Sequence, residues 1–495
     1  MSASNGSQAA LRHSRARVVA HGALFVALGA LLTACTVGPN FRPPDPPTAQ
    51  TYVGPTDAPA PADQKIALGE RIEGDWWSQF HSPALDQLIR QALEGNQDVV
   101  AARSRVDQAK EEVNAAHGAL LPQVDFGTTA GRQKYGAALF GPLDFTIPPF
   151  TYYIVGPTVK APLDLFGGGK RVVEQKAAYA SYQASELEAA YLSLTANVVL
   201  QVLSVAEARD QIQVVEGIIS DDQRNADLVQ KALDDGSATK TQLFSARSQL
   251  AMDRTLLPEL HQQESTARHA LAILVGRSPS EWAPPPIALT DFVLPQEIPA
   301  TLPSELVHRR PDITAAEAQL HGASAAIGVA TANLYPQVDL TGSLTQQALT
   351  PGALFNGVSL AWATAASLTQ PLFNGGRLKA QQRAAIDGYQ SALASYRQVV
   401  LRSFGEVADR MQALSNDADQ FHAQREAAEA AQSARDLVRR SFAVGNSGVL
   451  DVLDAERSTA QAQLGLSRAR ALRLLDSARL YVALGGSPVG AQPAR

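Results

Sequence analysis

Few side chains in this 495-residue chain stand at spacings that would support catalysis. The segment Gly167–Lys170 is rich in glycine, but it lacks the upstream glycine spacing of a phosphate-binding loop, and Arg171 follows where that loop has serine or threonine. The nine histidines show no metal-ligand spacing, and no serine or cysteine has the setting of an activated nucleophile. We therefore expect no catalytic residue, no metal site, no cofactor and no enzymatic activity.

The chemistry that the sequence does offer is lipid modification of its single cysteine, Cys35. Basic residues precede an apolar run over residues 18–32, which is the order of a bacterial secretory signal. The segment Leu32-Thr33-Ala34-Cys35 resembles the lipobox of bacterial lipoproteins. That resemblance implies that residues 1–34 are removed and that Cys35 carries a diacylglycerol and an N-acyl chain. Thr36 is not aspartate, which implies sorting to the outer membrane; the alternative is an ordinary signal with a chance cysteine.

Composition narrows the remaining classes of function. Charged residues make up 18% of the chain and the formal net charge is −6, so it lacks the basic footprint of a nucleic-acid-binding protein. Prolines recur between residues 39 and 61 in a polar stretch without periodicity, which predicts an extended or loose arm. We found no later segment with the roughly 18 uncharged apolar residues of a membrane helix, so any later crossing of a bilayer should use strands.

The sequence contains an internal repeat. Its anchors come in the same order in both copies, and four such pairs are hard to obtain by chance. They are Leu121–Phe126 with Tyr335–Leu340, Phe166–Lys170 with Phe373–Arg377, Gly236 with Gly445, and Gly276–Pro279 with Gly485–Pro488. We divide the chain into a signal peptide (1–34), an acylated Pro-rich arm (35–70), a first structural repeat (71–290), a second (291–488) and a C-terminal tail (489–495).

Each copy is expected to hold a strand hairpin between helices. Apolar residues recur at helical spacing over residues 96–120 and 312–334, and each run stops at a proline. Alternation then begins at Val124 and at Val338, and return strands are expected over residues 152–163 and 358–368. These strands are about ten residues long, near the length of a tilted membrane strand.

Two very long helices follow these hairpins. Residues 170–235 and 377–443 contain no proline, and each stretch would extend roughly 100 Å as a continuous helix. Each reaches a glycine, Gly236 or Gly445, and is followed by a return helix. Pro258 should kink or break the first return helix.

Four strands cannot close into a barrel, and open strand edges are not tolerated in hydrocarbon. The strands must therefore be closed between chains. Two chains would give eight strands and three would give twelve, and these residues alone do not choose between them, although an eight-stranded barrel would leave no channel.

Three further motifs carry a family resemblance: Asp75–Phe80, Arg310–Ile313 and Asp451–Ala455. With the repeat and the lipobox, the chain resembles the outer membrane factor family, the TolC-type channels, and within it the NodT-like lipoprotein branch. The resemblance implies a mixed α and β fold: a homotrimer whose 12-stranded β-barrel is continued by a 12-helix periplasmic α-barrel. It also implies a passive, gated efflux duct in the outer membrane that docks with a periplasmic adaptor and an inner-membrane transporter.

In that family the second helical tip carries the constriction, so Leu450, Asp451 and Asp454 are the candidate gate. Leu450 would be an apolar plug, and the two aspartates would form acidic rings that favour cations. Opening would follow when an adaptor splays the tips. The residues also allow simpler roles, because Asp454 could pair with Arg457 and Asp451 could cap its helix.

The tips themselves are the expected adaptor-docking surface. Its residues are Gly236, Ser237, Ala238, Thr239, Gly445, Asn446, Ser447 and Gly448. Phe442 stands where relatives often have tyrosine, and Gln242 stands where many have aspartate. We therefore expect no tyrosine latch and no acidic ring at the first tip.

The rival interpretation is a lipid-anchored periplasmic adaptor or coiled-coil scaffold, which would also have long helical hairpins. An adaptor has one such hairpin, whereas this chain has two, and it also has two strand pairs of membrane length.

Overall fold

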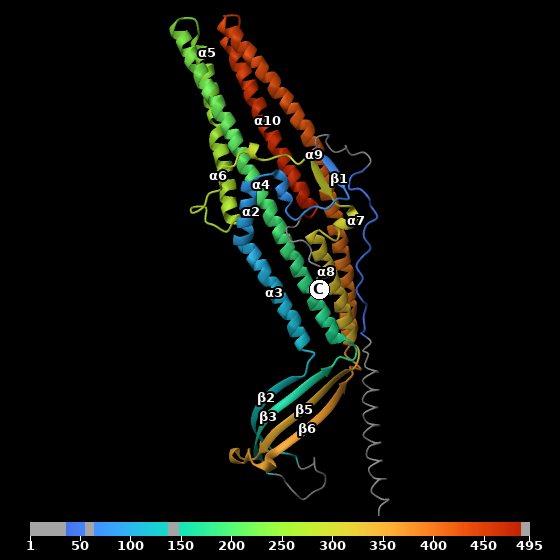
Figure 1. Ribbon diagram of the computed structural model, residues 1–495. Helices are drawn as coiled ribbons and strands as arrows, with labels where there is room; N and C mark the ends of the chain where they lie inside the picture. The colour runs from blue at the N-terminus through green and yellow to red at the C-terminus, as the bar shows by residue number, and fades with distance from the viewer. Residues whose placement is uncertain (1–35, 55–63, 137–147, 487–495) are drawn as a thin grey trace, which may run out of the picture. The chain divides into compact units, whose positions relative to one another are not determined.

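The computed structural model describes residues 36–54, 64–136 and 148–486 (Figure 1). The signal peptide, Cys35 and the C-terminal tail lie outside the described residues. Their assignments, and the residue boundaries of the two repeats, therefore stay predictions.

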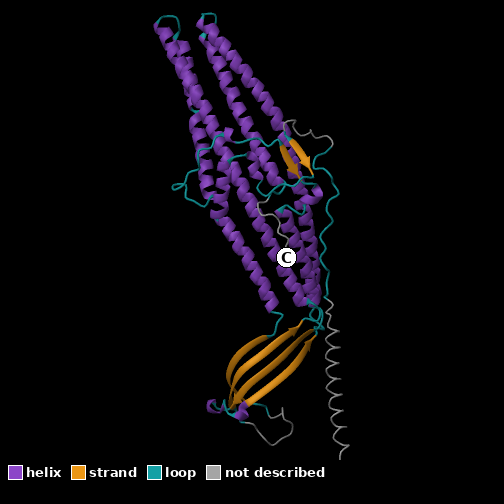
Figure 2. Ribbon diagram, in the orientation of Figure 1, coloured by secondary structure: helices purple, strands orange, loops and turns teal. Residues whose placement is uncertain are grey.

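Helices make up most of the described chain (Figure 2). They are α2 (Pro83–Gly95), α3 (Gln97–Gly118), α4 (Gly168–Asp234), α5 (Lys240–Arg254), α6 (Leu256–Leu274), α7 (Pro303–Leu306), α8 (Pro311–Ala332), α9 (Arg377–Ala443) and α10 (Val449–Ala483). Short 3-10 turns occupy Trp76–Phe80, Leu289–Asp291, Pro351–Ala353 and Gly357–Ser359. Both α4 and α9 run for 67 residues, as their proline-free sequences predict.

A four-stranded antiparallel sheet holds the two predicted hairpins. Its strands are β2 (Gln123–Gln133), β3 (Phe150–Leu163), β5 (Gln337–Ala348) and β6 (Leu360–Thr369), and their order in the sheet is β2-β3-β5-β6. Within the described residues β2 and β6 each have one strand neighbour. Both outer edges therefore keep a row of backbone groups without a partner strand.

The two faces of this sheet differ in chemistry. Because side chains alternate along a strand, the pairing register places them on opposite faces. One face is apolar and exposed, with Val124, Phe126, Leu340, Leu344, Trp362 and Leu368. The other is polar, with Asp125, Thr129, Lys160, Asp339, Thr341 and Ser343. An exposed apolar face of this kind suits contact with lipid, and the polar face suits contact with water.

Contacts divide the chain into two compact units. Unit 1 comprises Met1–Pro43, Asp107–Ser181 and Glu317–Ala394, and unit 2 comprises Pro44–Val106, Tyr182–Ala316 and Ser395–Arg495. The four-stranded sheet belongs to unit 1, and both helical tips belong to unit 2.

The helices of unit 1 lie in the order α3-α4-α8-α9. Lys176 on α4 pairs with Glu112 on α3 at 2.8 Å. The other side of α4 meets α8, where a His321 ring nitrogen lies 3.0 Å from Glu174. On its far side, α8 meets α9 through a bond that the Gln382 amide donates to Thr331 Oγ1 at 3.0 Å. This order parallels that of the strands.

A buried arginine on α4 holds the start of the N-terminal arm in unit 1. The Arg171 side chain is 4% exposed. It donates hydrogen bonds to the carbonyls of Val37 and Gly38, at 3.2 and 3.3 Å, and to the Asn40 side chain at 2.9 Å. It also pairs with Glu174 at 2.6 Å. The guanidinium therefore satisfies three oxygens of the arm and one carboxylate of its own helix.

Two close contacts complete this attachment. A Cβ on Gly38 would lie 2.5 Å from the Cα of Gly328 on α8, so a larger residue cannot replace Gly38 without moving the backbone. The Phe41 ring stacks on His321 with centroids 4.4 Å apart. The arm, expected to be extended or loose, is therefore fixed at its first described residues.

The core of unit 2 is built around stacked aromatic side chains. Trp76 is 1% exposed, and its ring lies 5.5 Å from the buried ring of Tyr481. Beyond the predicted elements, β1 (Lys65–Leu68) pairs in parallel with β4 (Glu297–Ala300). The first return helix breaks at Thr255, three residues before Pro258, whereas α10 continues unbroken.

One expectation about apolar segments was wrong. An 18-residue window of α4 has a mean hydropathy of 1.6 and is apolar enough to cross a membrane by length and composition. However, 61% of this window is buried inside the molecule, and the buried Val202 and Leu203 of α4 belong to the core. We therefore assign this part of α4 to the protein interior.

Replacing Arg171 with alanine should release the arm and lower the free energy of unfolding by ~3 kcal/mol, because it removes a buried charged partner. Chymotrypsin should then cleave after Phe41 faster than in the unaltered protein. Lys176→Ala, which removes a half-exposed ion pair from the same helix, should cost less than about 1 kcal/mol and leave Phe41 protected. Equal cleavage rates in both variants would mean that Arg171 does not hold the arm.

Candidate channel gate and docking tips

The first helical tip is shaped by a glycine just beyond α4. Gly236 has φ +76°, a left-handed conformation that other residues adopt with strain. Its N–H donates to the Leu233 carbonyl at 3.0 Å, and the Ser237 N–H donates to the Ala232 carbonyl at 2.7 Å. These bonds satisfy carbonyls that the end of the helix leaves free.

The second tip repeats this turn after α9. Gly445 has φ +79°, its N–H donates to the Phe442 carbonyl at 3.0 Å, and the Asn446 N–H donates to the Ser441 carbonyl at 2.9 Å. Six of the eight predicted docking residues are exposed, and Ala238 and Ser447 are half-buried. The structure thus brings these residues into two matching turns; their docking role stays a prediction.

The helices that leave the two tips are capped in matching ways. At the first tip the Thr239 N–H donates to the Gln242 side chain at 2.8 Å, and the Gln242 N–H donates back to Thr239 Oγ1 at 3.3 Å. At the second tip the Gly448 N–H donates to Asp451 Oδ2 at 2.8 Å. Gln242 and Asp451 therefore both cap the start of their helix, because an amide oxygen and a carboxylate oxygen can each accept the backbone hydrogen bond.

The three candidate gate residues lie on the first turns of α10. Leu450 is 53% exposed. Asp454 pairs with Arg457 at 3.2 Å, and its side chain is 74% exposed. Both simpler roles are thus present in the single chain, as the cap made by Asp451 and the pair made by Asp454. The channel role of these residues depends on neighbouring chains and stays a prediction.

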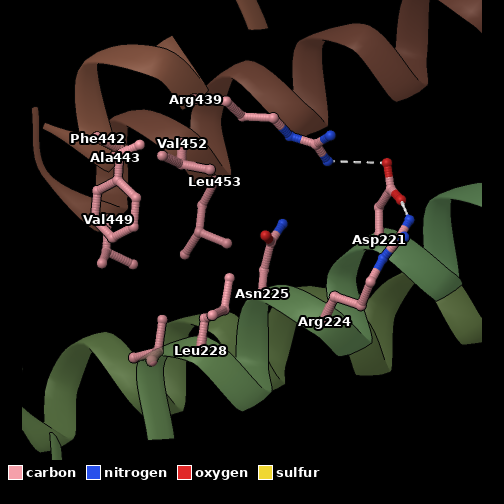
Figure 3. A pocket seen from close by; sticks show the side chains of 11 residues that line it. Asp221, Arg224, Asn225, Leu228, Arg439, Phe442, Ala443, Val449, Val452 and Leu453 are labelled. Carbon is pink, nitrogen blue, oxygen red and sulfur yellow. Dashed lines mark hydrogen bonds and ion pairs between the residues drawn. The ribbon is translucent and has the colours of Figure 1, made fainter. Parts of the chain in front are cut away.

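Below the tips the two helical hairpins pack through a small apolar cluster. Val449 and Leu453 of α10 contact a group that includes Ala226 and Val229 of α4, with Phe442 at its margin. Beside it lies a cavity of about 500 Å³ between α4 on one side and α9 and α10 on the other (Figure 3). Phe442 adds to this packing.

An ion pair beside this cavity joins the two hairpins. Arg439 on α9 pairs with Asp221 on α4 at 2.9 Å (Figure 3). It also pairs with Glu456 on α10 at 2.5 Å. Arg224 also pairs with Asp221. One guanidinium therefore joins three helices, and separating the hairpins would break its pair with Asp221 of α4, whose side chain is 20% exposed.

Next to this network lies a buried carboxyl. Asp222 on α4 is 2% exposed, and its Oδ2 has no hydrogen-bond partner. Burial, together with the neighbouring carboxylate of Asp253 on α5, raises the pKa of Asp222 to about 8. Sequence reasoning did not single out Asp221, Asp222 or Arg439. The available signal was that Asp222 stands at helical spacing from the buried Ala226 and Val229.

Comparison with known proteins decides the family. The model of the outer membrane efflux protein family matches residues 88–277 and 302–486 of this chain. The chain belongs to the outer membrane efflux protein family. As a member it is an outer-membrane efflux channel, which confirms the predicted family, fold class, function and location.

Other members of the outer membrane efflux protein family are similar along most of the chain. The pyoverdine export outer membrane protein OpmQ of Pseudomonas putida is 34% identical over 430 residues, which cover 85% of this chain and 89% of that protein. Nodulation protein T of Rhizobium leguminosarum bv. viciae is 27% identical over 92% of this chain and 91% of its own length. The structure of the outer-membrane channel OprN covers 92% of this chain and all of its own, with a TM-score of 0.83 and 28% identity.

The buried Asp222 should make stability depend on pH. Its pKa is raised in the folded state, so its contribution is fully present below the ordinary pKa of 3.8 and is lost as pH rises through about 8. The free energy of unfolding should therefore fall between pH 4 and 8, with a slope of up to ~1.4 kcal/mol per pH unit from this one group.

Thermal unfolding at pH 5 and pH 8 tests this. Asp222→Asn should flatten the slope. The remaining slope would come from the other carboxyls whose pKa burial raises, which are Glu188, Glu207 and Asp417; burial and Asp476 raise the pKa of Asp417 to about 7. Asp454→Asn, at an exposed position, should leave the slope unchanged. An identical slope in Asp222→Asn and in the unaltered protein would refute this role.

Proposed function

We propose that three copies of this chain close into one passive duct, with a 12-stranded β-barrel in the outer membrane and a 12-helix tunnel in the periplasm. The four-stranded sheet carries this proposal, since it has an apolar face, a polar face and two open edges. Closing the edges between copies satisfies the backbone and directs the apolar face to lipid. Twelve strands also leave room for a channel, which eight would not.

In this proposal the chain works as the outer part of a tripartite efflux system. A periplasmic adaptor docks at the tips formed by Gly236–Thr239 and Gly445–Gly448, and an inner-membrane transporter supplies the energy. The duct needs no catalytic residue and no cofactor beyond the lipid on Cys35. Similar relatives are named for pyoverdine export and for toluene efflux, which supports the view that selectivity belongs to the pump.

We assign the gate to the second tip. Three copies would place Leu450 as an apolar constriction and Asp451 and Asp454 as rings of carboxylates. Adaptor docking would then act on the contact between hairpins at Val449, Leu453 and Arg439, because these residues hold the tips together in each copy.

Closure into a trimer predicts an oligomer that resists detergent and dissociates on heating. Unheated gel electrophoresis should show a trimer band that becomes a monomer band after boiling, and the purified protein should conduct ions in planar bilayers. The lipid-anchored adaptor or scaffold predicts instead a monomer that leaves the membrane without detergent once the lipid is removed. That result would end the duct proposal.

The acidic rings predict sensitivity to polyvalent cations. Replacing both Asp451 and Asp454 with asparagine removes the charge but keeps an oxygen that can cap α10, so the fold should survive. Block of the bilayer conductance by a trivalent cation should then weaken. Gln242→Glu, which adds a carboxylate at the matching position of the first tip, shows whether any charge near the tips has this effect. Unchanged block in the double variant would remove the two aspartates from the gate.

A further inference from the structure

The two outer helices of unit 1 each leave one side without a neighbouring helix, and charged side chains stand on both of these sides. We propose that the uncovered side of α9 binds the uncovered side of α3 in the next copy, in a register set by the internal repeat, with Arg383 facing Asp107 and Glu111. The proposal rests on the closure of three copies described above. It adds the identity of the contacting side chains.

The burial of two equivalent helices shows where a neighbour is missing. α3 and α8 are the same element in the two repeats, and each has 22 residues. In unit 1, α8 lies between α4 and α9, and none of its residues from Glu317 to Ala332 is exposed except Gln319. α3 has α4 on one side, and its other side leaves Asp107, Gln108 and Glu111 exposed.

α9 shows the complementary pattern. It buries Leu378 and half-buries Gln382, Ala385 and Tyr389, which lie along one stripe that includes the contact with α8. Its opposite side is exposed. α3 therefore lacks the neighbour that α8 has in α9, and α9 lacks the neighbour that α4 has in α8.

The helix boundaries define the register. α4 and α9 both have 67 residues and start at Gly168 and Arg377, a spacing of 377 − 168 = 209, which Gly236 and Gly445 beyond their ends repeat. The anchor before these helices, Phe166 with Phe373, has a spacing of 373 − 166 = 207, so two residues are inserted between Phe373 and α9, and within the helices we use 209. α3 and α8 start at Gln97 and Pro311, a spacing of 311 − 97 = 214. Any contact of α4 with α8 within the chain can therefore be translated into a contact of α9 with α3 of the next copy.

The Glu174–His321 contact translates into a pair of opposite charge. Glu174 corresponds to Arg383 (383 − 174 = 209), and His321 corresponds to Asp107 (321 − 107 = 214). Glu111 lies one helical turn from Asp107 on the same side of α3. In the Glu174–His321 contact the acidic residue is on α4, whereas in the proposed pair the acidic residue is on α3 and the basic residue is on α9. The two partners are complementary in both cases.

Neighbouring residues support the same pairing. Lys379 lies one turn before Arg383, and among the described residues no ion pair joins either of them to a carboxylate. Asp107 lies 3.9 Å from Lys110 of its own helix, and both of these side chains are exposed. At the sheet end of these helices, Phe166 stacks on Tyr335 with centroids 4.8 Å apart. Their equivalents, Phe373 and Leu121, are 92% and 61% exposed. An apolar contact between copies would cover both.

Disulfide cross-linking of the full-length protein tests the register. Arg383→Cys combined with Asp107→Cys should give covalent dimers and trimers on oxidation, and the same protein without the two new cysteines shows any background from Cys35. Gln390→Cys with Asp107→Cys is the matched control, because Gln390 lies two turns further along the same side of α9, about 10 Å away. It should give at least tenfold less cross-linked product.

A charge exchange provides the second measurement. Arg383→Glu alone should lower the temperature at which the detergent-resistant trimer dissociates, and adding Asp107→Lys and Glu111→Lys should restore most of the loss. Rescue supports a direct contact, whereas additive losses would overturn it. If the trimer forms but cross-links through position 390 or through neither pair, the register is wrong while the duct proposal stands. If the unaltered chain forms no trimer, both proposals fail.

Discussion

The unpaired backbone at the edges of β2 and β6 is the constraint on which the rest of the structure depends. Hydrocarbon offers no water to these amide and carbonyl groups, so a four-stranded sheet with an apolar face cannot stay open in a membrane. The helices of unit 1 follow the same order as the strands, and they also end in two uncovered sides. A single rotation that pairs the strand edges can therefore cover the helix edges as well.

Duplication explains why so much of the fold could be predicted from the sequence. Each large element is predicted twice, once in each copy of the repeat. The strands are indicated by alternation after Pro122 and Pro336, and the long helices by the proline-free stretches before Gly236 and Gly445. The pairing of β1 with β4 could not be predicted, because four-residue strands show no clear period and Lys65 pairs with Glu297 far along the chain. Hydropathy also could not separate the buried core of α4 from a membrane segment, since both are apolar.

The candidate site was predictable where local geometry decides it. Gly236 and Gly445 end their helices because the left-handed turn favours glycine, and a cap at Asp451 follows from its position on the first turn. The partners of Arg439 depend on how α4, α9 and α10 come together, so no local pattern reveals Asp221 and Glu456. Asp222 differs from a surface aspartate only through burial, which is a property of the packed helices.

The break at Thr255 makes the two hairpins mechanically unequal. A bending load concentrates where a rod is weakest, and the first hairpin has such a joint between α5 and α6, whereas the 35 residues of α10 form a continuous strut. The first hairpin can therefore bend near Thr255 in its return limb, while its other limb, α4, runs unbroken for 67 residues. A push on the second tip is carried along α10 toward the stacked rings of Trp76 and Tyr481. Both limbs of the second hairpin, α9 and α10, are thus unbroken, whereas one limb of the first contains a joint.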